Sequence, residues 1–151
     1  MNILVVDDEI SYRQLLLTFL KMQGFTVFTA ADGLEALKQL SETQIDFIIS
    51  DIYMPLMDGL KLHAKVREIS DYKTIPFLFI SGYSDQNTLA ALPKTKNDGF
   101  IQKTQPLTLL MQWIHYLMTP EEKRPSTPPI EKPIPTQYER TRDPSYHKRR
   151  K

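Results

Sequence analysis

Three adjacent carboxylates follow the first apolar run of the sequence. Residues 3–6 read ILVV, and Asp7, Asp8 and Glu9 come directly after them. Neighbouring carboxylates repel one another, and each would have a raised pKa unless a cation lay nearby. A hard divalent ion such as Mg²⁺ removes the repulsion, because it prefers oxygen ligands and binds through one or two carboxylates plus phosphate oxygens. The run of acids therefore predicts a cation site that other parts of the chain complete.

Three further residues that could do chemistry stand at the ends of later apolar runs. They are Asp51, Ser81 and Lys103. A lysine supplies a point charge that suits a phosphate, and a serine hydroxyl can donate to a phosphoryl oxygen. An aspartate beside a metal ion and a lysine can act as a nucleophile that accepts a phosphoryl group. With Asp8 and Asp51 as direct ligands of Mg²⁺, Asp7 can act through a water, and a backbone carbonyl just after Asp51 can fill another position.

The elements that must position these residues alternate along the chain. Short, continuous apolar runs predict strands covered on both faces, as in a parallel sheet flanked by helices. Segments of helical period separate the runs, and Pro106 is well placed as the first residue of the last helix. The predicted strands lie at 3–6, 25–29, 47–49, 77–80 and 100–101, and the predicted helices lie at about 12–20, 34–40, 62–69, 84–92 and 106–118.

Five strand-then-helix units predict an α/β fold with right-handed crossovers. We expect a doubly wound, five-stranded parallel sheet of order 2-1-3-4-5 with helices on both faces, which is the flavodoxin-like arrangement. In this architecture ligands bind beyond the carboxyl ends of the strands, where the strand order reverses. Each of the candidate residues follows or ends a predicted strand, so we expect all of them at this one edge.

Four motifs carry a resemblance to a known family. VVDDE at 5–9, SDIYMPLMDG at 50–59, ISG at 80–82 and DGFIQK at 98–103 resemble, in order and spacing, the response-regulator receiver domain of two-component signalling systems, of the single-domain chemotaxis-regulator type. The resemblance covers residues 1–118. It implies these roles: Asp51 as phosphoacceptor, Asp7 and Asp8 as the acidic pair that holds Mg²⁺ together with Asp51 and the backbone carbonyl of Tyr53, Ser81 as switch hydroxyl, Phe100 as switch aromatic, and Lys103 as phosphate partner.

The resemblance also implies partners. A sensor histidine kinase or a phosphotransfer protein would donate the phosphoryl group, and phosphorylation would change the face that runs from the strand at 77–80 to the helix at 106–118. That face would control a downstream protein effector or form a homodimer through the last two helices. Such a domain is not an enzyme beyond its own phosphorylation and dephosphorylation, and no recognisable DNA-binding domain follows residue 118.

Two positions depart from the family pattern. Lys103 is followed by Thr104 instead of proline, and we expect a trans bond between them because a cis bond before any other residue costs about 2.5–4 kcal/mol. The switch aromatic is Phe100 rather than tyrosine, so it has no hydroxyl.

Tyr53 and Tyr83 occupy the family positions that border the path of the hydrolytic water. Two bulky phenols there predict a slowly dephosphorylating receiver.

The last part of the chain differs in composition from the rest. Residues 119–151 carry nine basic and five acidic side chains and seven of the eleven prolines, whereas residues 1–118 carry ten basic and thirteen acidic side chains. Few large apolar side chains occur there, so we expect a disordered, basic, proline-rich tail that adds nothing to stability beyond about Pro120. The chain has no cysteine and no apolar run long enough to span a bilayer, and we expect a cytoplasmic protein.

Two other functions stay open at this point. A pseudo-receiver would bind a partner without ever accepting phosphate, although every catalytic position is filled here. An aspartate-nucleophile phosphatase would also use aspartate, Mg²⁺ and lysine, but it needs an acidic residue two positions after its nucleophile. Tyr53 stands at that place after Asp51. We interpret His63 as a surface or helix-packing residue rather than a ligand.

Overall fold

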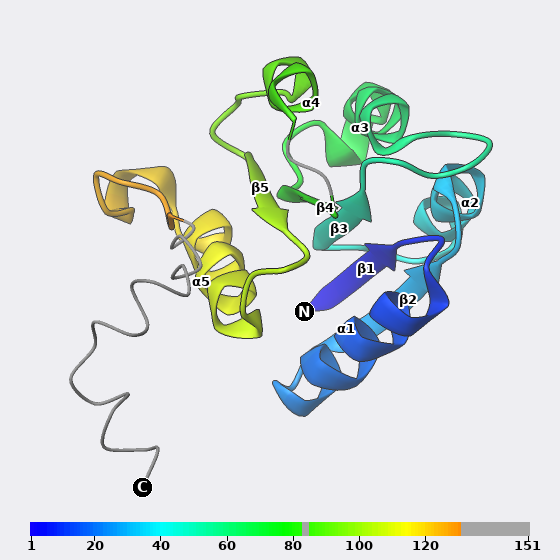
Figure 1. Ribbon diagram of the computed structural model, residues 1–151, viewed down its shortest axis with the longest axis horizontal. Helices are drawn as coiled ribbons and strands as arrows, with labels where there is room; N and C mark the ends of the chain where they lie inside the picture. Colours follow the sequence, from blue (N-terminus) through cyan, green and yellow to red (C-terminus); the bar gives the residue numbers. More distant parts are fainter. Residues whose placement is uncertain (83–84, 131–151) are drawn as a thin grey trace, which may run out of the picture.

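The computed structural model describes residues 1–82 and 85–130. Their strands form one parallel sheet in the order β2-β1-β3-β4-β5, as the sequence predicts, and Figure 1 shows helices on both of its faces. The strands are β1 (Asn2–Val6), β2 (Thr26–Ala30), β3 (Phe47–Asp51), β4 (Phe77–Ser81) and β5 (Asp98–Gln102). The helices are α1 (Ile10–Met22), α2 (Gly33–Glu42), α3 (Gly59–Glu68), α4 (Gln86–Ala91) and α5 (Leu107–Met118), with 3-10 turns at Ser70–Tyr72 and Glu121–Lys123.

Alternate strand residues supply two cores, one on each face of the sheet. In β1, Leu4 and Val6 face the core under α2 and α3, whereas Ile3 and Val5 face the core under α1 and α5. Because successive side chains of a strand point to opposite faces, a strand covered on both sides must be apolar throughout. The continuous runs of the sequence follow from this constraint.

The sequence located the elements to within a few residues, and two of the differences at their ends have a structural reason. β5 begins at Asp98, two residues before the predicted run, because an edge strand pairs on one side only and tolerates polar residues. Pro106 is the N-cap of α5, with φ −62° and ψ 148°, and not its first helical residue. No helix in the described ranges is long and apolar enough to cross a membrane.

Asp98 joins α3 to the start of β5 through a buried charge cluster. Its Oδ1 lies 2.8 Å from His63 Nε2 and 2.7 Å from Arg67 Nη2, and its Oδ2 accepts a hydrogen bond of 2.5 Å from Thr95. Burial alone would raise the pKa of Asp98, but these hydrogen bonds and the neighbouring cations outweigh burial and lower it. His63 is buried and packs edge-on against Phe77, with ring centroids 4.9 Å apart. It is therefore a helix-packing residue with a charged partner that the sequence did not reveal.

Residues 119–130, the part of the expected tail that the structure describes, contact the domain. Arg124 donates hydrogen bonds to the carbonyls of Lys96, Leu117 and Thr119. The composition of the segment did not show this, because one guanidinium that binds three carbonyls needs no apolar surface. The expected domain boundary after Met118 stays a prediction, and residues 131–151 lie outside the described residues.

Replacement of Asp98 by asparagine should destabilise the fold by about 2–4 kcal/mol near neutral pH, because His63 and Arg67 lose their buried charged partner. A folded-state pKa below the unfolded value means that the stabilisation is present above about pH 4 and is lost as the pH falls through the folded pKa. Urea unfolding of the wild type and Asp98→Asn from pH 7 to pH 3 measures both effects.

Asp71→Asn is the matched control, since Asp71 is exposed on a 3-10 turn. A difference between wild type and Asp98→Asn no larger than the control's, or one that does not shrink in acid, would contradict the role given to the cluster.

Candidate functional site

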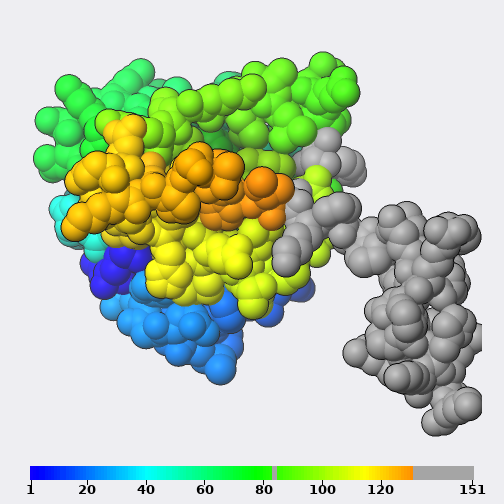
Figure 2. Space-filling view, turned by 90° about the vertical axis from the view of Figure 1, so that its left-hand side faces the viewer, coloured from blue at the N-terminus to red at the C-terminus, as the bar shows by residue number. Residues whose placement is uncertain are grey.

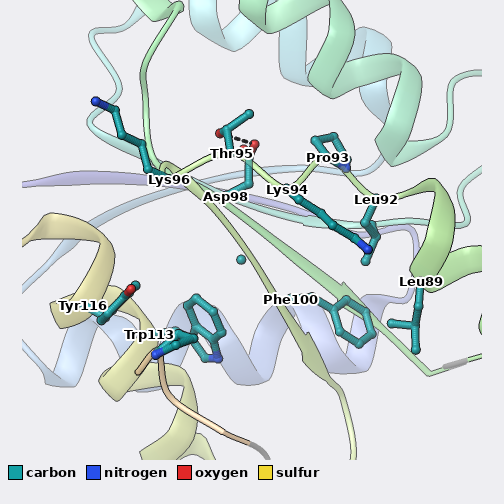
Figure 3. A pocket seen from close by; sticks show the side chains of 12 residues that line it. Leu89, Leu92, Pro93, Lys94, Thr95, Lys96, Asp98, Phe100, Trp113 and Tyr116 are labelled. Carbon is teal, nitrogen blue, oxygen red and sulfur yellow. Dashed lines mark hydrogen bonds between the residues drawn. The ribbon is translucent and has the colours of Figure 1, made fainter. Parts of the chain in front are cut away.

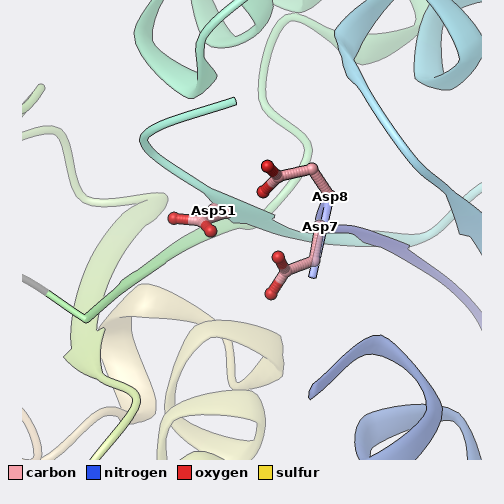
Figure 4. Close-up of side chains that lie close together, drawn as sticks. All are labelled: Asp7, Asp8 and Asp51. Atoms are coloured by element: carbon pink, nitrogen blue, oxygen red, sulfur yellow. The ribbon is translucent and has the colours of Figure 1, made fainter. Parts of the chain in front are cut away.

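Three carboxylates meet at the carboxyl ends of β1 and β3. One ligand oxygen from each of Asp7, Asp8 and Asp51 can be chosen so that all three lie within 4.8 Å of one another, and Figure 4 shows the side chains facing the same space. The register that pairs Val6 with Ser50 places the residues after them side by side. Asp7 and Asp51 are buried, at 0% and 6% exposure, whereas Asp8 is exposed. The cluster therefore has an open side.

Lys103 brings a positive charge into the cluster from the loop after β5. Its Nζ lies 2.8 Å from Asp7 Oδ2, 2.9 Å from Asp51 Oδ2 and 3.1 Å from Glu9 Oε2. The ammonium also lies 4.9 Å from the centre of the Tyr12 ring, a cation–π distance. One cation thus neutralises part of the charge of three acids that lie up to 96 positions before it in the sequence.

The charges change the ionisation of both partners. Burial raises the pKa of Asp7 to about 6, against the lowering effect of Lys103 and the hydrogen bond of 2.9 Å from the Glu9 N–H to Oδ1. Burial alone would lower the pKa of Lys103, but Asp7 and Asp51 outweigh it and raise the pKa above its usual range. Lys103 therefore stays charged at every physiological pH, whereas Asp7 is the acid whose charge depends on its surroundings.

The loop that follows Asp51 approaches its backbone closely. The Gly59 N–H donates a hydrogen bond of 2.7 Å to the Ile52 carbonyl, and a side chain at position 59 would collide with the carbonyl oxygen of Asp51. Only glycine allows this contact, so the DG at 58–59 fixes the conformation of the chain beside the candidate nucleophile. Asp58 then caps α3, accepting a hydrogen bond of 2.8 Å from the Lys61 N–H.

The residues present fit a divalent metal ion. Asp7 Oδ2 is buried and accepts no well-aligned hydrogen bond within the described residues, and it forms an ion pair of 2.8 Å with Lys103. Such an oxygen, with two further carboxylates beside it, has the hard donor chemistry that Mg²⁺ prefers. Asp7, Asp8 and Asp51 would hold the ion; the ligand role of the Tyr53 carbonyl stays a prediction.

The other predicted site residues fall at the same edge with one exception. Ser81 is fully buried at the end of β4, and its carbonyl accepts a hydrogen bond of 2.9 Å from the Lys103 N–H. Phe100 is half-buried in β5 and packs against the core under α3. Tyr53 is 49% exposed, and its hydroxyl is hydrogen-bonded to Thr88 of α4. Tyr83 lies outside the described residues.

Three contacts of the site were not foreseen from the sequence. Glu9 and Tyr12 both contact Lys103, and Thr88 holds the hydroxyl of Tyr53. Glu9 directly follows the acidic pair, which was a usable signal; nothing in the sequence pairs Tyr12 or Thr88 with the site. The expected trans bond between Lys103 and Thr104 is confirmed, because no peptide bond in the described part of the chain is cis.

A doubly wound parallel sheet with paired acids, an aspartate and a lysine at the carboxyl ends of its strands defines the receiver class of signalling domain. The family model described as "Response regulator receiver domain" matches residues 3–115. The chain belongs to this family, and hence to the two-component signalling proteins.

Relatives and solved structures agree with this assignment. An uncharacterised 14.6 kDa protein of Leptolyngbya boryana is 36% identical over 111 residues, which cover 73% of this chain and 85% of that protein. Sensor kinase CckA of Brucella abortus is 32% identical over 80% of this chain, but the match spans only 13% of the kinase. The structure of chemotaxis protein CheY4 of Vibrio cholerae has a TM-score of 0.72 and 32% identity, and the match covers 78% of this chain and 98% of that one.

The affinity for Mg²⁺ should decrease as the pH decreases, because Asp7 must lose its proton to bind a cation. With a pKa of about 6, Asp7 is nearly fully ionised at pH 7.5 but mostly protonated at pH 5.5. We expect the association constant, measured by titration calorimetry, to fall by roughly fourfold between these two values. Asp7→Asn should bind Mg²⁺ more weakly and lose this dependence on pH, whereas Asp71→Asn should keep both.

The free energy of unfolding in metal-free buffer tests the pKa of Asp7 independently. A carboxyl whose folded pKa lies above its unfolded value of about 3.8 stabilises the fold fully below that pH, and this contribution is lost as the pH rises through about 6. In metal-free buffer, Asp7→Asn should therefore lose less stability than the wild type between pH 4 and pH 7. Equal losses of stability in the two proteins, together with a wild-type Mg²⁺ affinity that is independent of pH, would contradict the raised pKa of Asp7.

Proposed function

We propose that this receiver domain accepts a phosphoryl group on Asp51 from the phosphohistidine of a sensor kinase or a phosphotransfer protein. The observation that carries the proposal is the position of Lys103 Nζ, 2.9 Å from Asp51 Oδ2 and 2.8 Å from Asp7 Oδ2. This cation lies where negative charge builds up when a phosphoryl group reaches Asp51. A carboxylate with a fixed ammonium and an adjoining acidic pair is suited to phosphoryl transfer.

The transfer exchanges one bond to phosphorus for another. A carboxylate oxygen of Asp51 forms the new O–P bond as the N–P bond of the phosphohistidine breaks, and the departing imidazole nitrogen keeps the bonding electrons. Lys103 pairs with a phosphoryl oxygen through the transition state. The buried hydroxyl of Ser81, at the end of the adjacent strand, can donate to another phosphoryl oxygen. Mg²⁺, when bound by the acidic residues, supplies further neutralisation of the charge on the transferring group.

Two comparisons support the cofactor and the donor. The response regulator TrrA of Thermotoga maritima, solved in complex with Mg²⁺ and BeF, has a TM-score of 0.65 and 30% identity. Receiver domains also occur in kinase relatives, such as the hybrid histidine kinase CckA, whose receiver structure matches 79% of this chain at 32% identity. We infer from these that this chain takes its phosphoryl group in a phosphorelay of the same kind and uses Mg²⁺.

Phosphorylation would be read out at the face formed by α4, β5 and α5. Phe100 stands in this face and packs against the core, so a shift of Ser81 toward the phosphoryl group would free space into which the ring can move. A downstream protein effector, or a second copy of this chain, would bind the altered face. The domain itself would turn over only its own acyl phosphate and is in this sense not an enzyme.

Two other functions give different results in the same measurements. A pseudo-receiver never carries the phosphoryl group, and an aspartate-nucleophile phosphatase hydrolyses phosphomonoesters repeatedly. The residue two positions after Asp51 is Tyr53, whose hydroxyl is engaged by Thr88 and cannot serve as a carboxylic general acid.

Incubation of the protein with acetyl phosphate and Mg²⁺ should add one phosphoryl group at Asp51, seen as a single mass increment of the intact protein. Asp51→Asn should not be labelled, whereas Asp71→Asn should be labelled like the wild type. An unmodified wild type would favour the pseudo-receiver, equal labelling of Asp51→Asn would place the modification elsewhere, and steady turnover of a phosphomonoester would favour the phosphatase.

The acyl phosphate should decay slowly, because Tyr53 stands two positions after Asp51, with its backbone N–H 3.3 Å from Asp51 Oδ1, and its bulky ring would hinder the approach of a water. After removal of the donor, the double variant Tyr53→Asn, Tyr83→Ala should lose its phosphate about tenfold faster, a change of about 1.4 kcal/mol in the barrier. The smaller amide opens the path and can orient a water.

Tyr53→Phe is the matched control, because it keeps the ring and removes only the hydroxyl that contacts Thr88; it should decay within about twofold of the wild type. The role of Tyr53 as a barrier would be refuted by a double variant that decays no faster than the wild type.

A further inference from the structure

Residues 119–130 fold back along α5, and we call them the C-terminal strap. Pro125, Thr127, Pro128 and Pro129 line one cavity together with α5 residues from Gln112 to Tyr116, and Ile130 lines another with the N-terminal part of the helix. The strap thus runs antiparallel to α5, from its last turn toward its first. Figure 2 shows the strap, in orange, lying across the yellow α5 beneath the green region of α4.

Arg124 fastens the strap to the domain. Its guanidinium donates to Thr119 O at 2.8 Å, to Leu117 O at 3.0 Å and to Lys96 O at 2.5 Å, so it joins the end of α5 to the loop before β5. It also lies 5.1 Å from the centre of the Tyr116 ring. Carbonyls in the last turn of a helix lack partners within the helix and carry its negative dipole end, which favours a cation at this place.

The strap closes one side of a groove between α4 and α5. Figure 3 shows Trp113 and Tyr116 on one side of this cavity and Leu89 and Phe100 on the other. The volume is about 440 Å³, and Pro128 of the strap is part of the lining. The rings of Trp113 and Tyr116 meet edge to face at 5.7 Å, so they form an aromatic wall of the kind on which proline rings pack.

The spacing of the prolines suits this wall. Pro125 and Pro128 are three residues apart, which is one turn of a polyproline II helix. Both line a neighbouring cavity beside Tyr116, and Pro128 also lines the groove. Arg124, directly before them, has φ −72° and ψ 148°, which is polyproline II geometry. A segment with its φ angles already restricted loses little entropy when it binds, so a few contacts can hold it.

We propose that the strap is an intramolecular ligand that covers one side of the groove between α4, β5 and α5, with Arg124 as its anchor, Pro128 at the groove and Pro125 beside Tyr116 of α5. A protein that binds the whole of this face must displace Pro128. The strap therefore limits the binding of partner proteins to the face that we propose changes on phosphorylation. A second copy of the chain would be limited in the same way. The inference rests on the proposed function for this readout, but the position of the strap can be measured in the unphosphorylated chain and so tested separately.

Trp113 makes the test direct because it is the only tryptophan of the chain. Its indole N–H is buried and donates no hydrogen bond within the described residues, so it gives a single NMR signal that responds to opening of the groove. In the full-length chain, Arg124→Ala should shift this signal and speed its hydrogen exchange by about tenfold or more, because the anchor is lost. Lys123→Ala is the control, since Lys123 is exposed on the adjacent 3-10 turn, and it should match the wild type.

A synthetic peptide of residues 119–130 provides the second arm. It should bind the Arg124→Ala variant saturably, with a dissociation constant of roughly 0.1–1 mM, and shift the indole signal back toward its wild-type position. It should not bind the wild type, because the chain's own strap already covers that side of the groove. Labelling of Asp51 by acetyl phosphate should be equal in the wild type and Arg124→Ala, so a loss of labelling in both bears on the proposed function and not on the strap.

Three results would overturn the inference. An indole signal unchanged by Arg124→Ala would show that the strap does not cover the groove. Equal binding of the peptide to the wild type and the variant would show that the groove is open. A wild-type signal that moves with protein concentration, with a dimer in sedimentation, would assign the groove to the strap of a second copy.

Discussion

The contact between the Lys103 ammonium and the surrounding carboxylates is the interaction on which the functional end of this domain depends. Asp7 and Asp51 are buried, and two buried acids so close together would be strongly unfavourable without a cation. Lys103 supplies that cation from the loop after β5, and so it holds this loop against the ends of β1 and β3. The neutralisation is partial, which leaves Asp7 with a raised pKa and the site with an affinity for further positive charge.

This residual imbalance explains why the site is suited to phosphate chemistry. Lys103 can be shared between a carboxylate and an incoming phosphoryl group, and the open side at Asp8 admits a metal ion without new burial. The rest of the domain keeps these groups in place with little freedom. Gly59 lets the next loop contact the backbone of Asp51, and the fully buried strands on either side cannot shift without disturbing one of the two cores.

The contacts between the C-terminal strap and α5 are of a different kind. There the contacts are aromatic and proline surfaces plus one guanidinium that binds backbone carbonyls, and they require no partner charge. Such an assembly is weaker and more easily exchanged than the charge cluster, because most of the surface of the strap remains exposed. The proposed phosphorylation site and the proposed displaceable cover can therefore coexist in a small domain.

The sequence by itself determined the fold and most of the site. Continuous apolar runs required strands covered on both faces, their alternation with helical segments required parallel pairing, and the rule for carboxyl ends then placed Asp7, Asp51 and Lys103 at one edge. Local patterns carry this information, because the period of hydrophobicity is set residue by residue. Only the tertiary structure decided which partners meet: the contact of Lys103 with Tyr12, the bond between Tyr53 and Thr88, the burial of His63 beside Asp98, and the anchoring of Arg124. These pairs join residues whose approach depends on packing of whole helices and loops, which no local pattern encodes.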